Sequence, residues 1–199
     1  MKLSISAFEE LKRGDPDSFR VHQLLAYTYE AQDELDRAIE EYHTVLRLKP
    51  GLPGIHESIG HLYLKKQDEE RAIEQFQQEL KVDPYNVWAS LELGRVFMKR
   101  GAVDRALEYL EETVRHNPDL VEAHQALARG FLARNNTDKA IAHFKTAIRL
   151  DPKLESAHYE LGQLYRRLGR LAEASAELEI FEKLKAKKMS QEKSSSSPP

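Results

Sequence analysis

Five prolines recur at a fixed spacing of 34 residues along this chain of 199 residues. They are Pro16, Pro50, Pro84, Pro118 and Pro152. A fixed period of about this length is typical of stacked helix-turn-helix repeats, each of which is too small to bury its own apolar face. The spacing therefore predicts a chain of repeats that are stable only because neighbours pack against one another.

Setting each repeat to end two residues after a proline gives repeats 1 to 5, at 19–52, 53–86, 87–120, 121–154 and 155–188. Within each repeat, apolar residues recur at the i, i+3, i+4 and i+7 positions of two amphipathic helices. Between the two helices lie residues that mostly tolerate the left-handed backbone conformation. They are Asp33, Gln67, Gly101, Asn135 and Gly169.

Several positions keep one kind of residue in all five repeats. The seventh and eighth residues are a large apolar residue followed by Ala or Gly, which lets two helices approach closely. The eleventh residue is always aromatic, and the twentieth is always Ala. These columns resemble the tetratricopeptide repeat family over roughly residues 19 to 185. The resemblance implies an all-α fold, a right-handed superhelical solenoid of helix pairs, with a concave face lined by the first helix of each repeat.

The sequences that flank the five repeats depart from the pattern. Residues 1–18 match only the second half of a repeat, so we expect either an N-terminal cap or part of a longer repeat array. Repeat 5 lacks the proline and has Ser175 and Glu182 in apolar columns, so its second helix can run on to about Met189. We expect residues 189–199, which end in a Ser- and Pro-rich stretch, to be disordered.

The composition excludes several classes of site and partner. With no cysteine, the chain has neither a disulfide nor a thiolate that could bind a metal or act as a nucleophile. A net charge of −3 gives no overall attraction to nucleic acid. No apolar run approaches the ~18 to 20 residues that span a bilayer. We expect no nucleic-acid partner, no direct membrane insertion and a cytoplasmic location, with an exported or anchored parent protein as the alternative.

Eight histidines raise the question of a metal site. Four of them, His22, His56, His124 and His158, hold the fourth position of their repeats, where the resemblance implies a side chain that packs the two helices together. Neighbouring repeats place equivalent atoms about 10 Å apart, whereas a metal needs nitrogen ligands within about 2.1 Å. The chain has no Gly-x-Ser-x-Gly and no glycine-rich phosphate loop. We expect no metal, no cofactor and no enzyme activity.

The resemblance places the second, fifth, ninth, twelfth and thirteenth residues of each repeat on the concave face. Apolar and cationic residues alternate there, and basic residues outnumber acidic ones although the whole chain is acidic. Extended peptides suit such a groove because successive pockets take alternate side chains. The expected partner-binding residues are Tyr27, His61, Leu64, Trp88, Leu91, Arg95, Met98, Lys99, Arg129, Leu132, Tyr159 and Arg166.

Trp88 is the only tryptophan of the chain, and an exposed tryptophan beside Met and Leu is typical of a binding hot spot. The alternative is that its ring folds back on Tyr85 and Pro84 and packs the junction between repeats. Some members of the family hold C-terminal chaperone tails with a clamp of Lys and Asn at set concave positions. No repeat of this chain has a lysine at the fifth position, so we expect no such clamp.

These patterns predict a non-catalytic scaffold or adaptor that binds a protein or peptide segment in its concave groove. Acidic groups of the partner would pair with Arg95 and Arg129, and its apolar groups would pack on the exposed aromatic residues. The alternative function is an assembly module that self-associates through its repeat ends or belongs to a larger multidomain protein.

Overall fold

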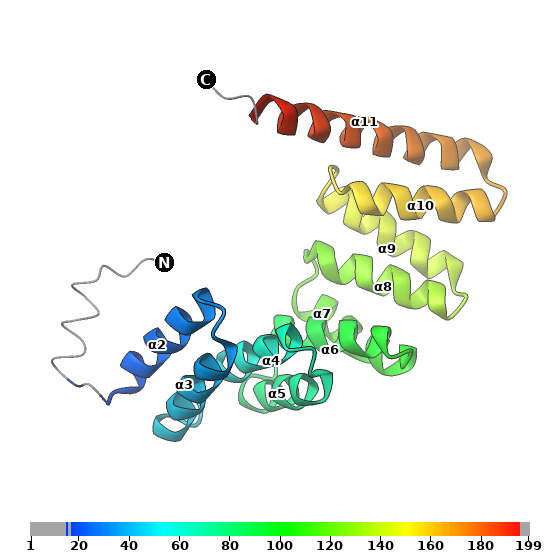
Figure 1. The fold of residues 1–199 in the computed structure, drawn as a ribbon. Helices are drawn as coiled ribbons and strands as arrows, with labels where there is room; N and C mark the ends of the chain where they lie inside the picture. Colours follow the sequence, from blue (N-terminus) through cyan, green and yellow to red (C-terminus); the bar gives the residue numbers. More distant parts are fainter. Residues whose placement is uncertain (1–14, 16, 196–199) are drawn as a thin grey trace. The chain divides into compact units, whose positions relative to one another are not determined.

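A computed structural model describes residue 15 and residues 17–195 of the chain, and this part holds ten α-helices and no strand (Figure 1). The first helices of the repeats are α2 (Phe19–Ala31), α4 (Ile55–Lys65), α6 (Val87–Lys99), α8 (Val121–Ala133) and α10 (Glu155–Arg167). The second helices are α3 (Leu35–Leu48), α5 (Glu69–Val82), α7 (Val103–His116), α9 (Thr137–Leu150) and α11 (Leu171–Ser195). The predicted all-α repeat solenoid is confirmed.

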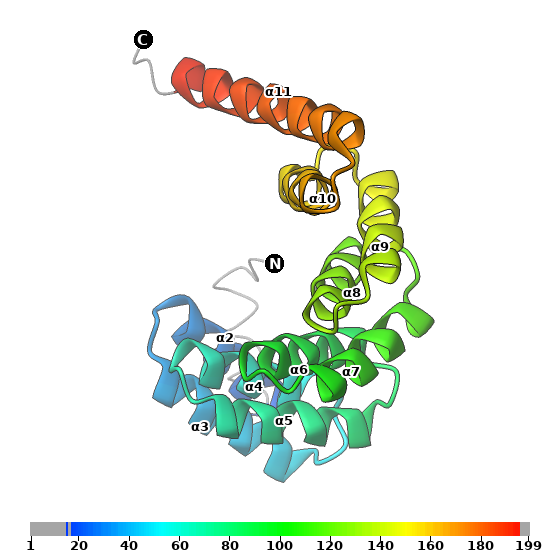
Figure 2. The same cartoon turned by 90° about the vertical axis from the view of Figure 1, so that its right-hand side faces the viewer.

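The chain divides into two compact bodies within α6. The N-terminal body ends at Val96 and contains α2 to α5 and most of α6, while the C-terminal body begins at Phe97. In each body the two helices of a repeat pack against one another, α2 on α3 and α4 on α5, then α8 on α9 and α10 on α11 (Figure 2). In these four repeats, the repeat is therefore also the unit of packing.

Small residues allow the close packing within a repeat, as the sequence predicts. A Cβ atom at Gly60 would lie 2.7 Å from the ring of Phe76, and one at Gly162 would lie 2.8 Å from Cγ of Leu178. Such distances are too short for real atoms, so only glycine lets these helices approach so closely. The alanines of the twentieth position are all buried as well.

The turn between the two helices of each repeat has one residue with a positive φ. Asp33, Gln67 and Asn135 have φ of 60°, 61° and 58°, and Gly101 and Gly169 have 72° and 73°. These are the five residues that the sequence marks as helix terminators, so this prediction is confirmed. Gln67 is the least suited of them, because a side chain without a local hydrogen-bonding role is strained in the left-handed region.

Of the two flanking segments, the structure describes mainly the C-terminal one. The expected half-repeat at 1–18 lies almost entirely outside the described residues. Helix α11 continues to Ser195, so the residues from Met189 to that point are helical rather than disordered. From Leu171 onward the helix contains neither proline nor glycine and is rich in Ala, Glu, Lys and Leu, which favour helix. None of the described helices combines the length and apolar character that crossing a bilayer requires.

Candidate partner-binding site

The predicted partner-binding residues differ in exposure. Tyr27, Trp88 and Tyr159 are 48%, 47% and 45% exposed and lie on α2, α6 and α10. Leu91 is fully buried, so its aliphatic side chain belongs to the core, where it gains from removal from water. Partner contact through Leu91 is therefore no longer expected. Of the others, Arg95, Lys99, Arg129 and Arg166 are exposed, and His61, Leu64, Met98 and Leu132 are half-buried.

These residues belong to both bodies. The N-terminal body holds Tyr27, His61, Leu64, Trp88, Leu91 and Arg95, and the C-terminal body holds Met98, Lys99, Arg129, Leu132, Tyr159 and Arg166. One groove that runs past all of them stays a prediction.

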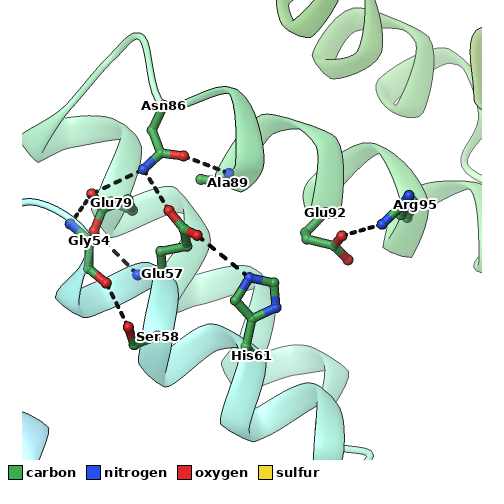
Figure 3. Close-up of polar contacts among 9 residues, drawn as sticks. All are labelled: Gly54, Glu57, Ser58, His61, Glu79, Asn86, Ala89, Glu92 and Arg95. Atoms are coloured by element: carbon green, nitrogen blue, oxygen red, sulfur yellow. Dashed lines mark hydrogen bonds and ion pairs between the residues drawn. The ribbon is translucent and has the colours of Figure 1, made fainter. Parts of the chain in front are cut away.

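In the N-terminal body, Glu57 on α4 holds His61 in place (Figure 3). His61 Nε2 lies 3.7 Å from Glu57 Oε1, and Asn86 Nδ2 donates a hydrogen bond of 2.8 Å to Glu57 Oε2. These contacts lower the pKa of the Glu57 carboxyl despite its partial burial, and the contact with His61 has a larger effect than the one with Asn86. The carboxylate thus stays charged at neutral pH and orients the imidazole one turn further along the helix.

A fully buried carboxylate, Glu79 on α5, lies beside this group. Its Oε1 accepts a 2.6 Å hydrogen bond from the backbone N–H of Gly54, and its Oε2 accepts one of 3.2 Å from the N–H of Glu57. Glu79 thereby caps the start of α4, where Gly54 has no side chain to do so. Asn86 caps the start of α6 in a similar way, because its Oδ1 accepts from the N–H of Ala89 at 2.8 Å.

Sequence reasoning missed the role of Glu79. The sequence feature that could have indicated it is the acidic residue at the twenty-seventh position of repeat 2. The other repeats have uncharged residues there, which are Val45, Thr113, Ala147 and Phe181.

The two arginines expected to bind a partner's carboxylates already pair with carboxylates of this chain. Arg95 Nη1 donates to Glu92 Oε1 at 2.6 Å within α6. Arg129 on α8 donates to Glu160 on α10 from both Nε and Nη2, at 2.8 and 2.6 Å, and this bonding raises the pKa of its guanidinium. A carboxylate from a partner would have to replace Glu92 or Glu160. The assigned role of the arginines therefore stays a prediction.

The four histidines of the fourth position each contact the twenty-third residue of the same repeat. His22 pairs with Glu41 at 2.6 Å, and His56 with Gln75 at 2.8 Å. The other two pairs are His124 with His143 at 3.0 Å and His158 with Glu177 at 2.7 Å, and all four contacts are made by Nδ1. The contacts join the two helices of a repeat, which agrees with the packing role expected for this column. The described residues contain no cluster of three potential metal ligands.

His143 differs from the other partners in this column because it faces a second imidazole. Its ring stacks on Phe131 with an interplanar angle of 14°. Burial, followed by the neighbouring His124 and Lys139, lowers the pKa of His143 to about 4. The His143 ring is therefore neutral at physiological pH.

A cation lies over the aromatic residue of the eleventh position in every repeat, which sequence reasoning also missed. Cations of this kind attract the electron-rich face of an aromatic ring. The sequence feature that could have predicted these contacts is the basic residue at the nineteenth position of repeats 1 to 4. The pairs are Arg37 on Tyr29, Arg71 on Tyr63, Arg105 on Phe97, Lys139 on Phe131 and Arg170 on Tyr165.

Three family models match the sequence. One, described as "TPR repeat", matches residues 128–169. Two are described as "Tetratricopeptide repeat"; one matches 63–130 and the other matches 19–51 and 155–187. No curated protein sequence matches the chain.

Solved structures with the same fold include a crystal structure of MamA, with 21% identity and a TM-score of 0.78, covering 83% of this chain and 97% of that one. MamA 41-end from Desulfovibrio magneticus RS-1 has 21% identity and a TM-score of 0.78, with 85% and 96% covered. YrrB, "a TPR protein with an unusual peptide-binding site", has 22% identity and a TM-score of 0.74, with 92% and 94% covered. At these identities the likeness shows the fold alone.

Proposed function

The chain belongs to the tetratricopeptide repeat family, and from this premise we propose that it is a non-catalytic scaffold that binds a peptide segment of a partner protein on its first helices. The observation that carries the proposal is the half-exposure of three large aromatic residues, Tyr27, Trp88 and Tyr159. Aromatic rings left half in water supply contact area at little entropic cost and are enriched at binding hot spots.

The three rings come from one stripe of the repeat. Trp88, Tyr159 and Tyr27 hold its second, fifth and ninth positions, which are i, i+3 and i+7 on the first helix. Residues at this spacing lie on one helix face. The same face carries His61, which Glu57 orients, and Arg95, which Glu92 restrains. The apolar residues of a partner would cover the rings. Its acidic residues would replace internal carboxylates such as Glu57 and Glu92.

Further support comes from YrrB, whose description names a peptide-binding site of that protein. The proposal includes no catalytic activity and no nucleic-acid partner. It places the protein in the cytoplasm, because the chain contains no cysteine and so suits a reducing compartment.

The test is affinity capture with the full chain, followed by measurement of the dissociation constant of the captured protein. Trp88→Ala should weaken binding by about 2 kcal/mol or more if the indole is a hot spot. The matched control is Leu48→Ala, since Leu48 is 50% exposed but lies on α3, a second helix. Equal losses in the two variants, or an unchanged affinity for Trp88→Ala, would contradict the proposal.

Assembly through the repeat ends, the other candidate, is less well supported at α11. In repeat 3, Leu107 of the twenty-first position packs against Gly130 of the next repeat. Repeat 5 exposes Ser175 at that position and Glu182 where other repeats have Leu, Val or Ile. Polar groups there do not favour stacking of another repeat on α11. Light scattering at rising concentration tests this point, and growth of the particle mass would favour assembly.

A further inference from the structure

The charge of the turn between the two helices reverses from one body to the other. We define the turn edge of a repeat as its twelfth to nineteenth residues, from the end of the first helix to the start of the second. In repeats 1 and 2 (30–37 and 64–71) the turn edges contain 4 Lys and Arg against 7 Asp and Glu. In repeats 3 to 5 (98–105, 132–139 and 166–173) they contain 8 Lys and Arg against 3 Asp and Glu.

One position of the repeat contributes directly to this difference in charge. In the N-terminal body, the cation of the nineteenth position pairs with a carboxylate of the sixteenth, Arg37 with Glu34 at 2.7 Å and Arg71 with Asp68 at 2.6 Å. Repeats 3 and 4 have neutral residues, Ala102 and Asn136, at the sixteenth position.

The cations of repeats 3 and 4 are consequently left without a carboxylate. Arg105 lies 4.0 Å from the centroid of the Phe97 ring, and Lys139 lies 4.8 Å from that of Phe131. Nowhere in the described part of the chain is a carboxylate within ion-pair distance of either cation; Asp104, which adjoins Arg105, pairs instead with Arg134 at 3.2 Å. The aromatic rings hold the two charges in place and leave them available.

The turn edges of the C-terminal body adjoin one another. The ion pair of Arg134 with Asp104 joins repeat 4 to repeat 3. Arg170 pairs with Glu173 of the same repeat, and the charge of Asp138 in repeat 4 is near enough to contribute slightly to the raised pKa of Arg170. Figure 1 shows the α8–α9 and α10–α11 turns on the same side. The resulting basic edge consists of Lys99, Arg100, Arg105, Arg134, Lys139, Arg166, Arg167 and Arg170.

We propose that this basic edge is a second interaction surface, which binds an acidic segment of a partner protein. Equivalent cations of neighbouring repeats are spaced by the helix-packing distance of about 10 Å. Every third residue of an extended peptide is also separated by about 10 Å. Carboxylates at that spacing can meet successive repeats, and cations already held by aromatic rings lose less conformational freedom on binding.

An acidic protein segment fits the edge better than a nucleic acid does. A nucleic-acid strand carries a charge about every 3.4 Å, which is much denser than one site per repeat. The edge also retains Asp104, Asp138 and Glu173, which would repel a continuous row of phosphates. This surface lies at the turns of repeats 3 to 5. It shares Lys99 and Arg166 with the predicted partner-binding residues but does not depend on the aromatic stripe of the first helices.

The test uses the full chain and a fluorescein-labelled oligoglutamate peptide, with binding followed by fluorescence anisotropy. Ala102→Glu together with Asn136→Asp places the carboxylates of the N-terminal body beside Arg105 and Lys139 without removing a cation. Asp at 136 can still cap α9, since the present side chain accepts from the N–H of Lys139. We expect affinity to fall by about tenfold or more, and that of the unchanged chain to fall with added salt.

The control is Arg37→Gln together with Arg71→Gln, which changes the net charge by the same amount in the N-terminal body. We expect less than a twofold change in affinity for the control, and none for Trp88→Ala, which tests the other surface. Circular dichroism establishes that each variant is folded. The proposal is overturned if the unchanged chain does not bind the peptide, if the Ala102 and Asn136 pair binds as well, if the control loses as much, or if an oligonucleotide of equal charge binds more tightly.

Discussion

The two bodies differ in how a side chain binds the backbone near the start of a first helix. In the N-terminal body, the buried carboxylate of Glu79 accepts hydrogen bonds from backbone N–H groups at the start of α4. In the C-terminal body, imidazole Nε2 atoms contact backbone carbonyls instead, His124 with Pro118 at 2.8 Å and His158 with Pro152 at 3.1 Å. In these three repeats a side chain holds the backbone before the first helix, but the residue that does so differs between the bodies.

The largest expected difference between the bodies concerns Glu79. Glu79→Leu fills the same space but leaves the partly buried N–H groups of Gly54 and Glu57 without their acceptor, which costs about 3 kcal/mol of the free energy of unfolding. Hydrogen exchange should then accelerate in α4 and stay unchanged in α8. Urea denaturation measures the total loss in the free energy of unfolding.

Thr113→Val is the matched control for Glu79→Leu. Thr113 holds the same position in repeat 3 and is equally buried, but its hydroxyl bonds only to the carbonyl of Tyr109. We expect its loss to cost about 1 kcal/mol. A Glu79→Leu variant as stable as Thr113→Val would mean that the carboxylate contributes no more than its packing.

Acid should affect the C-terminal body through His143. Its pKa is about 4 in the folded chain against an ordinary value of 6.5, so the unfolded chain binds the proton first as pH falls. The stability that the neutral ring provides is complete above pH 6.5 and is lost as the pH falls towards 4. Because the ring is only partly buried, we expect about 1 kcal/mol between pH 7 and pH 5.

His143→Gln isolates this effect. Repeat 2 already has Gln75 opposite His56, so the repeat accommodates glutamine at this position. Chemical denaturation at pH 7 and pH 5 should show a smaller loss for the variant than for the unchanged chain. Identical losses would assign the acid sensitivity to other groups.

The smallest expected difference lies in the turns. Gln67 in the N-terminal body and Asn135 in the C-terminal body both have a positive φ, but asparagine tolerates this conformation better. Gln67→Gly should therefore stabilise by about 0.5 kcal/mol, and Asn135→Gly by less. Thermal unfolding measures both, and a larger gain at Asn135 would contradict this order.

The sequence predicted the features that recur in every repeat. The proline period and the aromatic and alanine columns were sufficient for the helix pairs, and Gln67 and Asn135 were placed correctly in left-handed turns. These features are local, because each depends on residues within one helix or one turn. Periodicity expresses such preferences directly.

The features that the sequence did not predict depend on which side chains meet across helices. Leu91 shares its position with Gln125 and Tyr159, yet it alone of these is fully buried. Arg129 finds Glu160 on the next first helix, 31 residues away. Aligning the repeats shows which residues they have in common at each position. An exception such as the acidic Glu79 is therefore visible in the sequence, but the groups that it contacts are not.

The short range of the contacts between repeats has a consequence for folding kinetics. The hydrogen bonds of Lys65 with Glu30 and of Gln125 with Glu160 each join residues 35 positions apart. Closing loops of this length costs little chain entropy, so such a chain folds rapidly for its size. Nearest-neighbour coupling also lets a repeat array open from one end while the middle stays folded. Proteases should therefore shorten this chain repeat by repeat rather than destroy it in one step.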